Sequence, residues 1–237
     1  MIATGTESKR VIIRAIGPTL NDFGVPGALA DPTLELYQGN TLLFSNDDWR
    51  NSSQQAQIES SGLAPNKDLE SAIIWMLTPG ENYTAVLRGK NGQTGIGVVE
   101  AFDLDRAAAS KLANISTRGF VETDDNVMIA GLIVTPTDGA STKILVRALG
   151  PTLGDLGVPG VLANPTLDLV NSSGTVIRSN DNWKNSQRAE IEAAGLAPNH
   201  DQESALVEVV PPGAYTAIVR GNGRTTGVGL VEVYNIP

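Results

Sequence analysis

The chain has 237 residues, 26 acidic and 17 basic side chains, and a formal net charge of −9. It contains no cysteine and one histidine, which excludes disulfide scaffolds, thiol nucleophiles and Cys- or His-rich metal sites. The acidic balance argues against nucleic acid as a partner, and no apolar run approaches the roughly 20 residues that span a bilayer.

The first ten residues, MIATGTESKR, show no basic segment followed by an apolar one. A secretory signal has both features, so we expect none here. If the protein works outside the cell, we therefore expect this chain to be a mature or trimmed form.

Short strand-like runs, separated by Gly- and Pro-containing turns, follow. Asn91-Gly92 lies between the last two runs and supplies the positive φ that tight hairpins need. In this first part of the chain, a helical pattern is present only at residues 54–61. Many short strands with Gly- and Pro-containing turns and so little helix predict a β-sandwich. The predicted strands are residues 11–16, 34–37, 41–44, 72–77, 83–88 and 95–102.

A hairpin is predicted next, between residues 107 and 141. The apolar run 126–134 is strand-like, residues 112–121 are suited to pair with it, and the polar residues 122–126 form the turn. No equivalent hairpin precedes the strands of the first part, because Met1 aligns near Val134.

The remainder of the chain repeats the first part: residues 142–237 align with residues 9–105. RAIGPTL at 14–20 returns as RALGPTL at 147–153. The fold prediction is all-β, with two tandem antiparallel β-sandwich (jelly-roll-like) domains, each with one short helix. Residues 1–106 form the first, which lacks its N-terminal hairpin, and residues 107–237 form the complete second. The second copy's strands are predicted at 144–149, 167–170, 175–177, 205–210, 215–220 and 227–234, with its helix at 187–194.

An acidic loop is present in both copies and predicts a calcium site. Asn46-Asp47-Asp48 and its counterpart Asn180-Asp181-Asn182 cluster side-chain oxygens, which are the ligands that calcium prefers. The alternative is an Asx-rich turn whose side chains bond their own backbone. In the second copy, Asn164 and Asn182 replace two carboxylates of the first copy. Because ligand charge sets affinity, the site of the first copy is predicted to bind calcium more tightly than that of the second. The candidate ligands are Asp31, Asn46, Asp47, Asp48, Glu70, Asn180, Asp181, Asn182 and Glu203.

Three tryptophans are candidates for contact with a ligand or partner. Trp49 and Trp183 occupy the same place in the two copies and either stack on a sugar ring or anchor the acidic loop from the core. Trp75 is matched by Glu208, so we expect it on an outward face of the first copy, where it could make a contact specific to that copy.

Charged residues also recur inside the predicted strands. Because a charge within a sandwich needs a partner, structural Arg–Glu pairing is favoured over a catalytic carboxylate. The single histidine, His200, is matched by Lys67, so the repeated scaffold does not need an imidazole there. The residues of the predicted ion pairs are Arg14, Arg88, Glu100, Arg147, Arg220 and Glu232.

Three segments of the first copy carry a family resemblance: residues 31–37 (DPTLELY), 45–48 (SNDD) and 79–84 (PGENYT). They resemble the bacterial pre-peptidase C-terminal type of β-sandwich. The whole repeat is similar to tandem modules of large secreted or surface proteins of bacteria, in which a segment like LANISTRGFV (112–121) precedes each RAIGPTL block. The resemblance implies an accessory, non-catalytic domain, and in some relatives calcium binding.

These observations predict a non-catalytic structural or adhesive protein located outside the cell or on its surface. The missing hairpin would leave an open sheet edge, through which copies could self-associate into a filament by strand donation. The alternative is that this sequence is a piece of a longer array of such modules. The alternative is a carbohydrate-binding module that uses the tryptophans to bind glycans. A carboxylate-pair enzyme is disfavoured, because the acidic pairs lie in turns and recur in both copies.

Overall fold

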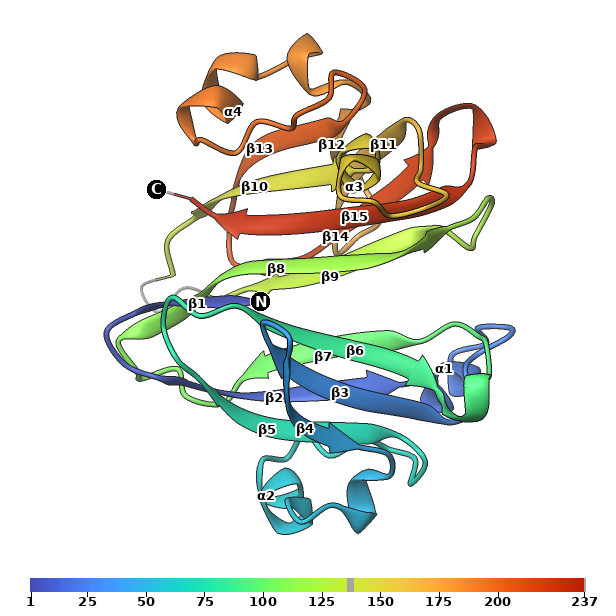
Figure 1. Cartoon of the computed structure of the whole chain (residues 1–237). Helices are drawn as coiled ribbons and strands as arrows, with labels where there is room; N and C mark the ends of the chain where they lie inside the picture. The colour runs from blue at the N-terminus through green and yellow to red at the C-terminus, as the bar shows by residue number, and fades with distance from the viewer. Residues whose placement is uncertain (136–138, 237) are drawn as a thin grey trace. The chain divides into compact units, whose positions relative to one another are not determined.

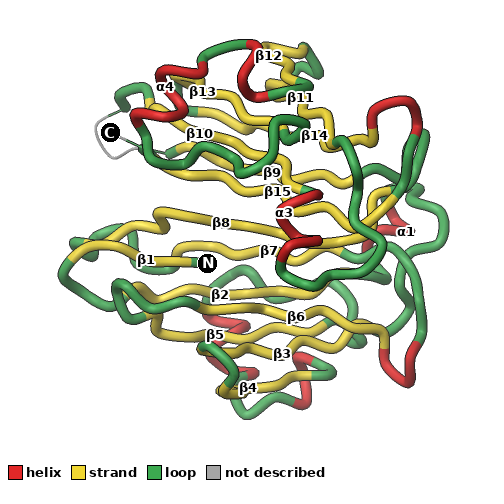
Figure 2. Tube along the Cα trace, turned by 45° about the horizontal axis from the view of Figure 1, so that its top comes forward, coloured by secondary structure: helices red, strands yellow, loops and turns green. Residues whose placement is uncertain are grey.

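The computed structural model describes residues 1–135 and 139–236, which form two compact units (Figure 1). Strands dominate both units and the helices are short (Figure 2). Unit 1 comprises Met1–Ala113 and unit 2 comprises Asn114–Pro237, so the boundary lies seven residues beyond the predicted one. The boundary falls inside strand β8 (Ser110–Val121), because the start of β8 lies beside the N-terminal strand of unit 1: the Thr6 N–H donates to the Ala109 carbonyl at 3.1 Å.

Unit 2 contains eight strands arranged in two antiparallel sheets. One sheet has the order β8-β15-β10-β13 and is continued beyond the start of β8 by β1 (Ile2–Gly5), the N-terminal strand of unit 1. The other has the order β12-β11-β14-β9. The first strand of the unit thus pairs with the eighth, the second with the seventh, the third with the sixth and the fourth with the fifth. This pairing is that of a jelly roll, which confirms the predicted fold class. The strands after β8 are β9 (Met128–Val134), β10 (Thr142–Leu149), β11 (Pro165–Asn171), β12 (Val176–Asn180), β13 (Ser204–Val210), β14 (Gly213–Gly221) and β15 (Gly227–Asn235). The predicted pairing of residues 112–121 with residues 126–134 is wrong, because β8 and β9 lie in different sheets and pair with β15 and β14 instead.

Unit 1 has the same plan with two strands fewer. Its sheets have the orders β5-β2-β7 and β4-β3-β6, which correspond to the third to eighth strands of unit 2. The short strand β1 also lies beside the start of β6, where Ile2 and Asn82 form an antiparallel bridge. The six strands are β2 (Lys9–Ile16), β3 (Pro32–Gln38), β4 (Thr41–Asn46), β5 (Ser71–Leu77), β6 (Tyr83–Gly89) and β7 (Val98–Asp103).

The main core of each unit lies between its two sheets and follows the period-2 alternation of strands. On β14, for example, Tyr215, Ala217 and Val219 are buried, and Ala217 and Val219 have no exposed surface. A second, smaller apolar cluster in each unit lies under a short helix and contains Trp49 in unit 1 and Trp183 in unit 2.

Helices occupy more of each unit than the sequence predicted. The two predicted helices are present as α2 (Gln55–Ser60) and α4 (Arg188–Ala193). Two further short helices, α1 (Thr19–Asp22) and α3 (Pro151–Asp155), begin within the repeated Gly-Pro-Thr-Leu motif and are too short to show a helical pattern. Single 3₁₀ turns are also present: η1 (Trp49–Asn51), η2 (Lys90–Gly92), η3 (Trp183–Asn185) and η4 (Asn222–Arg224). Across the described residues no helix is both long and apolar enough to cross a membrane.

Candidate functional site

Glu70 and Glu203 hold the repeated RAIGPTL and RALGPTL segments in place. Glu70 is fully buried, and its two oxygens accept four hydrogen bonds at 2.8–3.3 Å, from the backbone of Gly17, Thr19 and Lys67 and from the Thr19 hydroxyl. Glu203 is also fully buried and makes the equivalent four bonds at 2.6–3.3 Å. The prediction that these two carboxylates bind a metal is therefore wrong, because their acceptor sites are used by the chain itself.

Asn46 and Asn180 are also structural. The Asn46 amide oxygen accepts the Ala72 N–H at 2.8 Å, and its nitrogen donates to the Asp48 carbonyl at 3.1 Å. Asn180 makes the same two bonds with Ala205 and Asn182, at 3.0 and 3.2 Å. Each amide ties the end of β4 or β12 to β5 or β13 of the other sheet, so the oxygen predicted to bind a metal already accepts a hydrogen bond from the backbone.

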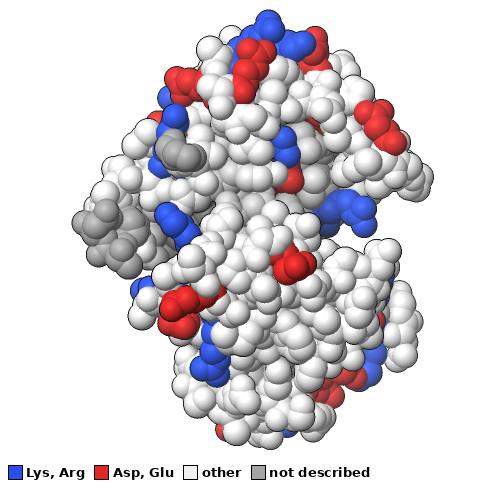
Figure 3. Space-filling model, turned by 60° about the vertical axis from the view of Figure 1, so that its left-hand side comes forward, with Lys and Arg blue, Asp and Glu red and all other residues white. Residues whose placement is uncertain are grey.

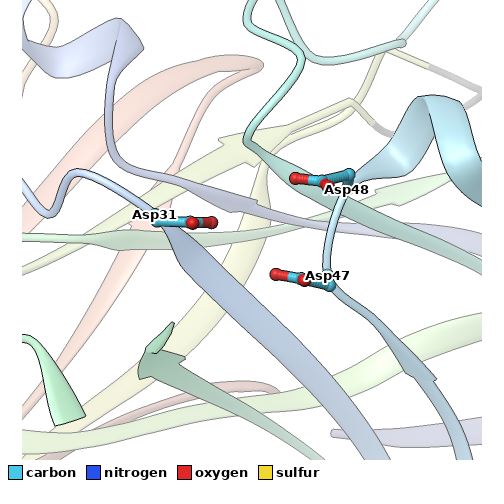
Figure 4. Close-up of side chains that lie close together, drawn as sticks. All are labelled: Asp31, Asp47 and Asp48. Carbon is cyan, nitrogen blue, oxygen red and sulfur yellow. The ribbon is translucent and has the colours of Figure 1, made fainter. Parts of the chain in front are cut away.

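Three of the predicted ligands do converge in unit 1: Asp31, Asp47 and Asp48. Asp31 immediately precedes β3, and the other two follow β4, so the pairing of β3 with β4 brings them together (Figure 4). One carboxylate oxygen of each lies within 4.8 Å of the others. The Oδ1 atoms of all three are buried and have no hydrogen-bond partner. Buried carboxylate oxygens without partners are costly, so this cluster calls for a cation.

One cation is supplied by the chain. The Lys90 ammonium lies 2.6 Å from Asp47 Oδ2 and 3.4 Å from Asp31 Oδ2, and its pKa is raised, chiefly by the hydrogen bond to Asp47. With the three carboxylates ionised and Lys90 protonated, the cluster carries a net charge of −2. An open hollow lined by Ser45, Asn51 and other polar residues adjoins Asp47 and Asp48.

The matching loop of unit 2 satisfies itself with neutral amides. Asn222, which replaces Lys90, donates to both oxygens of Asp181 at 3.1 and 3.0 Å. Asn164, with its amide nitrogen turned toward the acceptors, donates to Asp181 Oδ1 at 3.3 Å and to the Gln202 carbonyl at 2.8 Å. One carboxylate with amide donors does not need an added cation, so the predicted sites of the two units are chemically different.

The tryptophans are located in apolar clusters. Trp49 and Trp183 are 2% and 4% exposed, and their indole N–H groups donate to the Lys67 and His200 carbonyls, both at 3.1 Å. Neither ring is available for stacking on a sugar. Trp75 is half-buried rather than on an outward face: it faces the main core of unit 1 and packs against Phe44, with ring centroids 6.3 Å apart.

The repeated arginines lie in two kinds of ion pair. Arg14 donates through Nε to Glu100 at 2.9 Å, and Arg147 to Glu232 at 2.8 Å, both next to an aromatic ring of the last strand. Arg88 and Arg220 are more exposed and lie 3.5 Å from Glu35 and 2.8 Å from Asp168. On the face shown in Figure 3, basic and acidic residues alternate in small groups.

A buried ion pair in unit 1 escaped the sequence analysis. Lys9 is 1% exposed, and its ammonium contacts Asp103 Oδ2 at 3.0 Å and the Asp105 carbonyl at 2.6 Å. In unit 2 the corresponding residue is Thr142, so the repeat could have marked the position as specific to one copy.

The largest difference between the units is the open side of unit 1, which we define as the free edges of β6 and β7 with the core-facing side chains beside them. In unit 2 the equivalent strands, β14 and β15, are covered by β9 and β8. In the described part of unit 1, β6 and β7 end their sheets, apart from the short contact of β1. Val99 on β7 is 38% exposed, whereas its counterpart Val231 is 1% exposed. Ala85 and Leu87 are half-buried, whereas Ala217 and Val219 are fully buried.

Comparisons with known proteins add little to this geometry. No protein-family model matches the sequence, and a search of curated proteins finds no match. Among solved structures, the chain is similar to the PBCV-1 virus capsid, at 10% identity over 98% of this chain and 87% of that one, with a TM-score of 0.25. It is also similar to the VP2 subviral particle of infectious bursal disease virus, at 11% identity over 98% of this chain and 58% of that one, with a TM-score of 0.23. Both scores are too low to support a functional argument.

Proposed function

We propose that the chain is a non-catalytic structural protein that assembles through the open side of unit 1. The observation that carries this proposal is the exposure of a core position: Val99 is 38% exposed where the matching Val231 is 1% exposed. Free sheet edges beside apolar side chains are sites at which further strands add. Self-association through this side, including filament formation by strand donation, follows from the same feature.

The remaining parts of the proposal rest on the sequence. No catalytic step is assigned, because the two repeated buried carboxylates, Glu70 and Glu203, are used to hold the fold together. An extracellular or cell-surface location is supported by the similarity of the repeat to modules of secreted bacterial proteins. The carbohydrate-binding alternative loses support, because two of its three tryptophan rings are buried.

Sedimentation velocity of the purified chain tests the assembly. We expect species larger than the monomer that grow with concentration, and electron microscopy then distinguishes filaments from closed oligomers. Val99→Lys should shift the distribution to monomer, because it places a charge on the open side. Met76→Lys is the matched control, since Met76 is 49% exposed on β5, at the opposite edge of the same sheet. A wild-type chain that stays monomeric at every concentration, or equal effects of the two variants, would overturn the proposal.

A second function is favoured by a separate observation, the three buried Oδ1 atoms of Asp31, Asp47 and Asp48. We propose that this cluster binds a divalent cation, with Ca²⁺ the best match for an all-oxygen ligand set. The net charge of −2 left after Lys90 is counted equals the charge that such an ion neutralises. Unit 2 supports the assignment by contrast, since its amides replace both the carboxylates and the lysine.

Calorimetric titration with Ca²⁺ and melting curves in Ca²⁺ or chelator test this second function. A ligand at 100 times its dissociation constant adds about 2.7 kcal/mol to stability, and we expect this gain in unit 1 alone. Asp48→Asn should abolish it, while Asp201→Asn, in an exposed turn of unit 2, should leave it unchanged. Absence of binding heat together with an unchanged melting temperature would refute the cation site.

A further inference from the structure

We infer that Asn91 is a site of spontaneous modification, at which the side-chain amide is lost and aspartate and isoaspartate are formed. The chain has two Asn-Gly pairs, Asn91-Gly92 and Asn222-Gly223, which share a neighbour in sequence and differ in their surroundings. Asparagine is one of the thermolabile residues of proteins, so the surroundings of each pair decide where the amide is lost. The reaction requires neither the proposed assembly nor the proposed cation.

The chemistry needs only the chain itself and water. The main-chain nitrogen of Gly92 attacks Cγ of Asn91, so that a C–N bond forms and the bond from Cγ to the amide nitrogen breaks. The amide nitrogen takes the proton of the Gly92 nitrogen and leaves as ammonia. Water then opens the five-membered imide ring, at the side-chain carbonyl to give aspartate or at the main-chain carbonyl to give isoaspartate. Glycine has no Cβ to hinder the attack, so it is a favourable neighbour for this reaction.

Asn91 lies in the exposed turn η2, between β6 and β7, with its side chain unattached. Asn91 and Gly92 are both exposed and have positive φ angles of 55° and 76°. Asparagine tolerates this conformation better than most residues, so the turn itself does not exclude it. Within the described part of the chain, no hydrogen bond of the Asn91 side chain is present. Its amide is therefore free to turn toward the next main-chain nitrogen.

Asn222, by contrast, is held by a carboxylate. Its side-chain nitrogen donates to both oxygens of Asp181, at 3.1 and 3.0 Å, and its main-chain N–H donates to the Asn164 carbonyl at 2.9 Å. Hydrogen bonds to an ionised acceptor are stronger than those between neutral groups, and these must break before the Gly223 nitrogen can reach Cγ. We therefore expect Asn222 to react more slowly than Asn91 by about tenfold or more.

The position of Asn91 makes the modification specific to unit 1. The repeat assigns Gly223 to the same place in unit 2, with nearly the same φ of 63°, and glycine has no amide to lose. Lys90, one residue before Asn91, lies 2.6 Å from Asp47 and 3.4 Å from Asp31. Loss of the amide thus adds a negative charge, and isoaspartate adds a main-chain atom, in the turn that supplies the lysine of the acidic cluster.

Incubation of the full chain in mildly alkaline buffer, followed by digestion in acid and mass spectrometry, tests the inference. Each conversion replaces NH₂ by OH, and chromatography separates the aspartyl from the isoaspartyl peptide. In the folded chain we expect the product at Asn91 to form about ten times faster than at Asn222, or more. In concentrated urea the two pairs should react at similar rates, because only the glycine neighbour then remains.

Variants of the carboxylate complete the design. Asp181→Ala should release Asn222 and raise its rate toward that of Asn91, without changing the rate at Asn91. Asp201→Asn, in an exposed turn of unit 2, is the matched control and should change neither rate. Asn91→Gln should remove the reaction from unit 1, since its ring would be larger and forms more slowly. Equal rates at the two pairs in the folded chain, an Asn222 rate that Asp181→Ala leaves unchanged, or an Asn222 that stays slow in urea would each overturn the inference.

Discussion

The two units are duplicates in sequence, yet the same residue has different surroundings in each. Val99 and Val231 face the core from equivalent strands, and only Val231 is covered, because β8 and β9 complete its unit. The acidic loops of the two units differ in their charged groups: unit 1 has three carboxylates and a lysine where unit 2 has one carboxylate and three amides. A duplicated scaffold thus keeps its core and changes its edge and its ions, which is where we locate function.

The largest expected effect comes from placing a carboxylate at the equivalent core position of each unit. Val231→Asp should destabilise unit 2 by about 4 kcal/mol, because it buries an unpaired charge or a protonated acid. Val99→Asp should cost unit 1 about 1 kcal/mol or less, since that position is open to water. Urea unfolding followed by Trp183 fluorescence reports on unit 2, and hydrogen exchange of β2 reports on unit 1. Equal losses would show that the open side is closed in solution.

Substitution of the buried glutamates should destabilise the two units by similar amounts. Glu70→Gln and Glu203→Gln should each destabilise their unit by about 3 kcal/mol, because an amide nitrogen then faces hydrogen-bond donors. The measurement is thermal unfolding with hydrogen exchange resolved by unit. Glu59→Gln, at a half-exposed helical position, is the control and should have almost no effect. A large loss in one unit only would mean that the two networks are not equivalent.

At alkaline pH the stabilities of the two units should differ, because their last strands carry different aromatic residues. Burial, with a smaller contribution from Glu232, raises the pKa of Tyr234 to about 12 from an ordinary value of 10.0. The neutral phenol is thus favoured in the folded state, and its contribution to stability is complete below pH 10 and is lost as pH rises toward 12. Unit 1 has Phe102 at this place and should not show this loss. Melting curves of wild type and Tyr234→Phe check it, and an unchanged slope in the variant would contradict it.

The smallest expected effect is near neutral pH, at a pair that differs between the units. Lys67 lies 2.8 Å from Asp22 in unit 1, and His200 takes its place 2.7 Å from Asp155 in unit 2. The hydrogen bond to Asp155 raises the pKa of His200 above its ordinary 6.5. Its small contribution to stability is present below pH 6.5 and is lost as pH rises through the folded-state pKa.

Titration of His200 by NMR measures the shift directly. In Asp155→Asn the pKa of His200 should return toward the ordinary value, while Lys67 in unit 1 stays charged in this range, because the hydrogen bond to Asp22 raises its pKa above 10.5. An identical His200 titration in wild type and variant would show that the contact does not form in solution.

The sequence by itself determined the plan of the molecule. The repeat placed two β-sandwiches in tandem, and the alignment of Met1 with the end of the predicted strands 107–141 showed that the first copy has fewer strands. The hairpins predicted at the Asn-Gly turns were wrong, because β6 and β7 lie in different sheets, as do β14 and β15. Arg14 with Glu100 and Arg147 with Glu232 could be foreseen as ion pairs, because charged residues recurred together in strands that must bury one face. These features are local or periodic, so a single chain displays them.

Tertiary structure alone decided which polar residues are free to bind. Asn46, Asp47 and Glu70 look like one ligand set in the sequence, but Asn46 and Glu70 are consumed by backbone groups that the fold brings to them from distant segments. Asp47 is left to face Asp31 because β3 pairs with β4, and Lys90 joins them from the turn after β6. Whether a carboxylate is satisfied depends on donors far away in the chain, and only the packed structure brings those donors within hydrogen-bond distance.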